Sequence, residues 1–175
     1  MNTKKMIFRT ILLITCSVCL PCVSIAEELV KPDSDSPISA LRTLLEAQNV
    51  SDLEKALVVT RGEAAKTVAP SFANTSRMGI QFDTKNIVSK DSKTIGEFTI
   101  LTAQVSAKKG DKARSKDMIV AGTKIEGKWV ITYLDDDPSE PKKEDYENID
   151  VLPLADAEKD FKMWESRFSK LPKRR

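Results

Sequence analysis

The spacing of the apolar residues changes once along this chain, near Ile80, and this change constrains the fold more than any other feature. Before Ile80, apolar residues recur every three or four positions, which is typical of helices that bury one face. After it come four segments rich in β-branched and aromatic residues, joined by short turns. Helices followed by closely linked strands predict an α+β fold, with N-terminal helices packed on an antiparallel four-stranded sheet.

The predicted helices are located by their start and stop signals. Ser36 provides an N-cap, and Pro37 occupies the first helical position, where its missing N–H costs nothing. A capping box at Ser51–Glu54 predicts the start of a second helix. A short third helix is predicted over Glu63–Ala69, because Pro70 removes a backbone hydrogen bond and favours an irregular segment after it.

Four strands are predicted, over Ile80–Val88, Thr94–Ala107, Ala113–Ile125 and Lys128–Leu134. In the last strand, simple alternation puts Trp129, Ile131 and Tyr133 on one face of the sheet. The residues between them are also largely apolar, so neither face is an obvious solvent face. We therefore expect one face to pack on the helices and the other to be partly covered by the C-terminal segment or by a partner.

Residues 1–26 have the features of a signal peptide. Three basic residues precede an apolar run at positions 11–20, and Ser24 and Ala26 place small side chains where a signal peptidase reads them. The run is shorter than the roughly 20 residues that a membrane-spanning helix needs. We expect cleavage before Glu27, export to the periplasm or secretion, no stable membrane anchor afterwards, and a flexible lead-in over residues 27–35.

Removal of this peptide changes the composition of the chain. All three cysteines lie within it, so we expect no disulfide in the processed protein. It holds three basic and no acidic residues, so the 28 basic and 26 acidic residues of the chain become 25 and 26, a net charge of −1. That charge argues against nucleic-acid binding. The chain has no histidine, and we expect neither a metal site nor a cofactor.

The C-terminal part divides into a charged linker and a helix. Residues 138–152 are rich in charge and include two prolines, so we expect them to be too polar to bury. Residues 153–171 are predicted to form an amphipathic helix with an apolar stripe of Leu154, Ala157, Phe161, Trp164, Phe168 and Leu171. Either this helix folds back and covers exposed sheet, or its three aromatic residues anchor it to a partner or to a second copy.

Two stretches carry a resemblance to a known family. The helix pair over Ser36–Leu57 and the Glu-Gly-Lys-Trp-Val-Ile sequence at Glu126–Ile131 resemble the nuclear-transport-factor-two-like (cystatin-like) superfamily, in particular its exported bacterial members. The resemblance covers residues 36–137, the expected domain. It implies that the sheet is curved and wraps around the helices to form a cone with a pocket. Enzymes of the superfamily carry an Asp or a His–Asp pair in that pocket.

These observations leave three functional hypotheses open. The first is an exported, non-catalytic binding or accessory domain for a small apolar ligand or a protein partner. The second is a small acid/base enzyme of isomerase or hydrolase type that uses an Asp, such as Asp83 or Asp117, with Tyr133. The third is an assembly module that associates through the sheet or the C-terminal helix. The residues expected to bind a ligand or partner are Trp129, Ile131, Tyr133, Phe161, Trp164 and Phe168.

One charged cluster has two interpretations. Lys108, Lys109 and Lys112 surround Gly110 in a predicted hairpin loop. They are able to bind an anion, or they keep a hairpin tip soluble and discourage pairing with another strand edge. From the sequence alone, the second interpretation is favoured.

Overall fold

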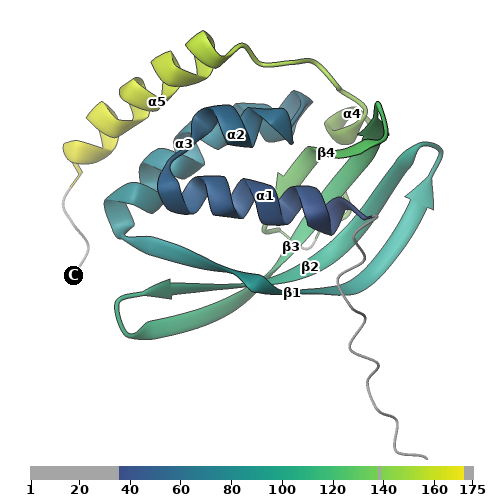
Figure 1. Ribbon diagram of the computed structural model, residues 1–175, viewed down its shortest axis with the longest axis horizontal. Coiled ribbons are helices and arrows are strands. Elements are labelled where there is room, and N and C mark those ends of the chain that lie inside the picture. Colours follow the sequence, from purple (N-terminus) through teal and green to yellow (C-terminus); the bar gives the residue numbers. More distant parts are fainter. Residues whose placement is uncertain (1–35, 138, 172–175) are drawn as a thin grey trace, which may run out of the picture.

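The computed structural model describes residues 36–137 and 139–171, and the predicted signal peptide and lead-in lie outside these ranges. The helices and strands follow in the order α1 (Pro37–Val50), α2 (Leu53–Val58), α3 (Gly62–Met78), β1 (Ile80–Ile95), β2 (Phe98–Lys109), β3 (Lys112–Ile125), β4 (Lys128–Asp135), α4 (Lys143–Tyr146) and α5 (Leu154–Ser169). The strands form one antiparallel sheet in sequence order, with β1 and β4 at its edges. The sheet curves around α1 (Figure 1). The α+β prediction is confirmed.

The first two helices begin close to where the sequence places them. The Ser36 hydroxyl accepts a hydrogen bond from the Ile38 N–H at 3.3 Å, as expected for an N-cap. The predicted capping box is wrong, because the N-cap of α2 is Asp52, whose carboxylate accepts from the Lys55 N–H at 2.9 Å. Ser51 instead ends α1 in the left-handed conformation, with φ of 57°.

The third helix is longer than predicted. It continues through Pro70 to Met78 and ends at Gly79, which adopts the left-handed conformation that favours glycine. Proline in a helix interior costs about 3 kcal/mol. Beyond it, α3 buries Phe72, Ala73 and Thr75, and one large apolar side chain contributes about 1.5–3 kcal/mol when buried. Tertiary packing therefore outweighs the local penalty at Pro70.

A β-bulge in β4 changes which residues share a face. Ile131 pairs with Gly122 and Tyr133 pairs with Ala121, so Thr132 has no partner residue on β3. The extra residue reverses the alternation that follows it. Ile131 therefore faces the helices, whereas Tyr133 faces the other side of the sheet. The prediction that Trp129, Ile131 and Tyr133 share one face is wrong for Tyr133.

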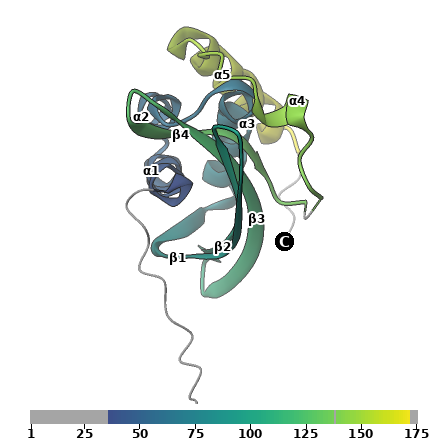
Figure 2. The same cartoon turned by 90° about the vertical axis from the view of Figure 1, so that its right-hand side faces the viewer.

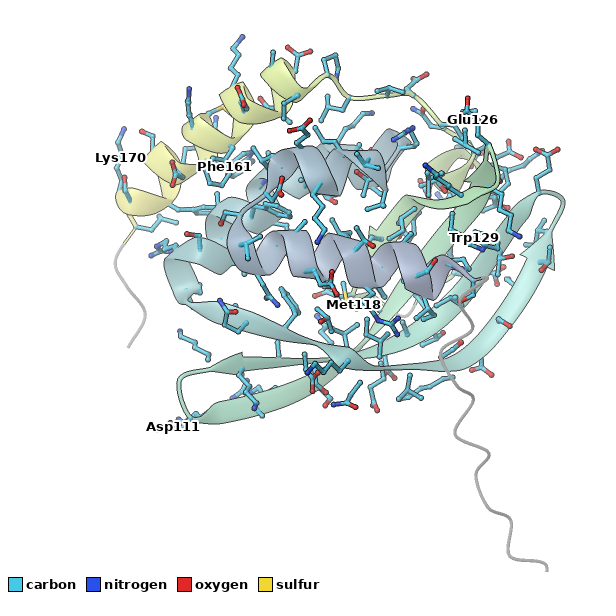
Figure 3. The ribbon with its side chains drawn as sticks, viewed as in Figure 1. Asp111, Met118, Glu126, Trp129, Phe161 and Lys170 are labelled. Carbon is cyan, nitrogen blue, oxygen red and sulfur yellow. The ribbon has the colours of Figure 1, made fainter. Side chains whose placement is uncertain are left out.

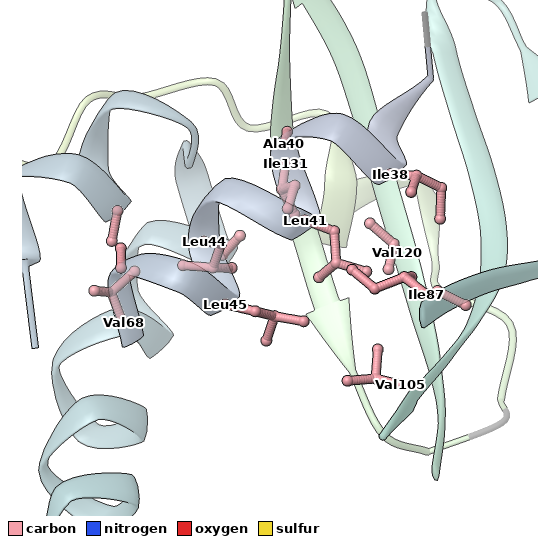
Figure 4. Packing of buried hydrophobic residues seen from close by; sticks show 14 of the residues in the cluster. Ile38, Ala40, Leu41, Leu44, Leu45, Val68, Ile87, Val105, Val120 and Ile131 are labelled. Carbon is pink, nitrogen blue, oxygen red and sulfur yellow. The ribbon is translucent and has the colours of Figure 1, made fainter. Parts of the chain in front are cut away.

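The main hydrophobic core lies between α1 and the inner face of the sheet. Leu41 and Leu45 of α1 pack against Val120 and Ile131, and each of these side chains is at most 1% exposed (Figure 4). The free edge of β4 is also partly covered, because the Arg61 N–H donates to the Ile131 carbonyl and the Ile131 N–H donates to the Val59 carbonyl, both at 2.8 Å. This end of the sheet is enclosed on its inner face and at its edge.

The segment after β4 is docked on the domain rather than extended as a linker. Tyr146 of α4 is buried against the outer face of the sheet, where its ring centroid lies 5.2 Å from that of Phe98. Figure 2 shows α4 on the opposite side of the sheet from α1. The Gly62 N–H donates to the Asp150 carbonyl at 2.9 Å. The prediction that this stretch is too polar to bury is wrong for Pro141 and Tyr146, whereas most of the other described residues of the stretch are exposed, as predicted.

The C-terminal helix folds back onto other helices. Ala157 is fully buried, and Phe161 packs against the main core. The Arg77 guanidinium of α3 donates to the Leu171 carbonyl at 3.0 Å, just after the end of α5. Figure 1 shows α5 beside α2 and α3, away from the sheet. The helix thus folds back as the first interpretation predicts, but the expectation that it covers sheet surface is wrong.

Candidate binding surface

The three predicted binding residues of β4 do not form a common surface. Ile131 is fully buried, and Trp129 packs at the margin of the same core with the Lys124 ammonium 5.3 Å from its ring centroid. Tyr133 lies on the outer face with Phe98 and Tyr146. The bulge at Thr132 separates these residues, so β4 on its own offers no aromatic binding face.

The three predicted residues of α5 also divide between two environments. Phe161 packs into the main core, which gives it a structural role (Figure 3). Trp164 and Phe168 contact each other with ring centroids 5.4 Å apart, and the Arg167 guanidinium lies 5.0 Å from the Trp164 ring centroid. Both rings are half-buried. Phe168 lines a hollow between α5 and α3.

The interior of the domain is filled by its own side chains. The resemblance implies a pocket between the helices and the sheet, and in that space lie Leu41, Leu45, Val105 and Val120 (Figure 4). A ligand at this place would have to displace side chains that are 3% exposed or less. We therefore expect a binding site on the outside of the molecule.

An Asp–Tyr pair does occur, on the outer face of the sheet. The Tyr133 hydroxyl donates to the Asp135 carboxylate at 3.1 Å. Burial and this hydrogen bond raise the pKa of Tyr133 to about 12. The backbone N–H of Asp137 is the main cause that lowers the pKa of Asp135. Both pKa values move away from neutrality, which makes the pair a poor acid/base couple at pH 7.

The other two candidate aspartates lie elsewhere. The pKa of Asp83 is lowered, chiefly by a hydrogen bond from the Asn86 amide at 2.8 Å. Asp117 is exposed and forms an ion pair with Lys90 at 2.7 Å. Both side chains already have partners, and neither lies in the aromatic cluster around Tyr133. The sheet therefore does not bring either residue to the predicted catalytic tyrosine.

The most distinctive surface feature lies at the free end of the β2–β3 hairpin, which extends beyond the helices (Figure 1). A two-residue turn at Gly110-Asp111 closes the hairpin, and Figure 3 shows Asp111 at its tip. Here a hollow of about 690 Å³ is lined by Met78, Ile80, Ala107, Lys108, Lys109, Asp111, Lys112 and Arg114. We call it the basic hollow. Its apolar residues, Met78, Ile80 and Ala107, are half-buried and form the floor, and its charged residues are exposed and form the rim.

The charges of the basic hollow are poorly compensated. Four basic side chains and one carboxylate line it, so its net charge is +3. Lys109 and Lys112 occupy directly paired positions on β2 and β3, where like charges repel. Among the described residues, no acidic side chain forms an ion pair with Lys109, Lys112 or Arg114. The hollow therefore has an excess of positive charge that its one carboxylate, Asp111, does not neutralise.

A second hollow provides a useful contrast. It measures about 540 Å³ and lies on the outer face of the sheet, and its basic residues are Lys90 and Lys116. Lys90 forms an ion pair with Asp117, and Lys116 forms one with Asp136. These charges are satisfied within the protein. Of these two hollows, only the basic hollow has an excess of positive charge that attracts an anion.

The sequence identifies part of the basic hollow but interprets it incompletely. It shows the three lysines, whereas Met78 and Ile80 are remote in sequence and join them only after folding. Edge protection explains Lys112 and Arg114, because β3 pairs with β4 only from Ile119 onward. It does not explain Lys108 and Lys109, because they lie on β2, which pairs with β1 and β3 on its two sides.

The comparisons with known proteins do not assign the chain to a family. Neither a scan against protein-family models nor a search of curated proteins gives a match. In the part of the chain that the structure describes, no helix is long and apolar enough to cross a membrane. No group of three or more Cys, Asp or Glu side chains within residues 36–137 and 139–171 is arranged to hold a metal ion.

Proposed function

We propose that this protein is an exported accessory domain that acts by binding, and that its ligand is an anion with an apolar part. One observation carries the proposal: four basic side chains and one carboxylate surround an apolar floor and together have a net charge of +3. The expected small apolar ligand is thereby revised, because the interior is filled and the hollow that remains is charged. Export rests on the signal-peptide features of residues 1–26.

The energetics support binding at this place. Repulsion between the paired Lys109 and Lys112 remains in the free protein and is relieved when an anion binds between them. The half-buried side chains of Met78 and Ile80 supply apolar contact, and the lysine stems add to it. An anion with an apolar part would use both features, whereas a simple inorganic ion would use only the first.

The test is a titration with 1-anilinonaphthalene-8-sulfonate, a fluorescent anion with an apolar body. We expect the double variant Lys109→Glu/Lys112→Glu to lose about tenfold in dye affinity, which is about 1.4 kcal/mol. The matched control is Lys128→Glu/Lys159→Glu, which makes the same change in net charge at exposed sites on β4 and α5. Equal dye affinity in the two double variants would overturn the proposal. Circular dichroism checks that both variants are folded.

Export has its own test. The N-terminal residue of the protein purified from the periplasm or the medium is expected to be Glu27. Recovery of the unprocessed chain in the cytoplasm would remove export from the proposal without affecting the binding site.

A further inference from the structure

We propose that the anion recognised by the basic hollow is the headgroup layer of an anionic phospholipid bilayer. The inference rests on the function proposed above and specifies its ligand. Three observations support it: the place of the hollow in the fold, the chemistry of its basic groups, and the distribution of charge over the whole domain.

The hollow lies where a flat surface is able to reach it. The β2–β3 hairpin carries it beyond the helices, and Asp111 marks the outermost turn (Figures 1 and 3). Lys108, Lys109, Lys112 and Arg114 are all exposed. Met78 and Ile80 are half-buried behind them. The exposed basic side chains therefore meet an approaching anionic surface before the apolar floor does.

The basic groups suit a diffuse anionic surface better than one coordinated ion. Three of the four are lysines, which act as flexible point charges, and only Arg114 has the planar fork that recognises a single phosphate in two places. A site for one bound ion would hold it with converging buried donors. All the basic groups of this hollow are instead exposed. Many headgroups side by side would satisfy them together.

The charge distribution orients the molecule. Residues 36–137 and 139–171 contain 21 basic and 22 acidic residues, a net charge of −1. Because the hollow carries +3, the remainder of these residues carries −4. An anionic membrane therefore attracts the hairpin end and repels the rest of the domain. Two features reduce the attraction, the Asp111 carboxylate and the partial negative charge at the end of α3 near Met78.

The experiment is flotation of the processed protein, beginning at Glu27, with lipid vesicles. We expect binding to vesicles of equal parts phosphatidylglycerol and phosphatidylcholine, and no binding to phosphatidylcholine alone. Raising the salt from about 50 mM to about 500 mM should abolish binding, because the Debye length then falls below the size of the hollow. Lys109→Glu/Lys112→Glu should lower the bound fraction at least fivefold, and Lys128→Glu/Lys159→Glu should leave it unchanged.

The outcomes separate the two proposals. If the processed protein does not float with anionic vesicles but Lys109→Glu/Lys112→Glu still loses the dye, the membrane inference is wrong and the anion site stands. If dye affinity does not change either, both are wrong. If poly-glutamate binds at low salt and anionic vesicles do not, the partner is an acidic polypeptide and the membrane inference is overturned.

Discussion

The two ends of β3 have opposite physical properties, although one strand forms both. Residues 119–123 pair with both neighbouring strands, and Val120 and Ala121 are fully buried. Residues 112–117 pair only with β2 and are exposed, and two of their basic side chains line the basic hollow. One end contributes stability through packing. The other retains an electrostatic repulsion that packing does not require, and we interpret that retained repulsion as the mark of a binding site.

The buried end should be the more sensitive one. Leu41→Ala removes a fully buried side chain that packs against this end of the sheet, and we expect it to lower the free energy of unfolding by about 2–5 kcal/mol. Urea denaturation followed by circular dichroism measures the change. Val58→Ala, at a position that is 61% exposed, is the control and should change the free energy by less than about 0.5 kcal/mol. Similar losses in the two variants would mean that the core lies elsewhere.

A smaller loss is expected where α5 is docked. Phe161→Ala removes a half-buried ring from the margin of the main core and should cost about 1–3 kcal/mol. The variant should sediment as the same species as the natural chain, because α5 packs within its own domain. If Phe161→Ala converts an oligomer into a monomer, the helix serves assembly, as the third hypothesis from the sequence predicts.

The outer aromatic cluster should show a moderate effect that depends on pH. Burial raises the pKa of Tyr133 to about 12 from 10.0, so its contribution is complete below pH 10 and is lost as the pH rises toward 12. We expect the melting temperature of the natural chain to fall in this range, and Tyr133→Phe to reduce that fall. At neutral pH the variant loses one hydrogen bond, about 0.5–1.5 kcal/mol. Identical pH profiles would show that Tyr133 is not coupled to folding.

The stability contributed by the same cluster is also expected to fall at low pH, which gives the stability–pH profile an acid limb. The pKa of Asp135 lies below 3.8, mainly because it accepts hydrogen bonds from the Asp137 and Asp136 N–H groups. Its contribution is therefore present above pH 3.8 and is lost as the pH falls below that value. Asp135→Asn should flatten this acid limb and move the start of the alkaline limb to lower pH, because the Asp135 carboxylate helps to raise the pKa of Tyr133.

Local signals in the sequence predict much of the fold. The N-cap at Ser36 and the β-branched runs after Ile80 act within a few residues, so they predict the first helix and the four strands. The predictions that are wrong depend on contacts between residues that are remote in sequence. Helix α3 continues through Pro70 because Phe72 is buried, and Tyr133 changes face because Thr132 forms a bulge. Neither contact has a local signature.

The sequence likewise predicts only part of the candidate site. A cluster of lysines is visible in the sequence, and so is its ability to bind an anion. The decision between anion binding and edge protection requires the order of the strands, because Lys108 and Lys109 lie on an inner strand and not on an edge. It also requires Met78, which the end of α3 brings to the hollow. The sequence predicts Trp129, Ile131 and Phe161 as binding residues, whereas they pack in or against the core.

The most direct test of the account is Lys112→Glu, measured for stability and dye affinity in the same preparation. The new carboxylate at position 112 faces Lys109, so repulsion becomes attraction and the free energy of unfolding should rise by about 0.2–1 kcal/mol. The affinity for 1-anilinonaphthalene-8-sulfonate should fall, while Lys128→Glu should change neither quantity by as much. A variant that is more stable and binds less well is the predicted result. A variant that is less stable and binds equally well would contradict the account, because Lys112 would then be a structural residue.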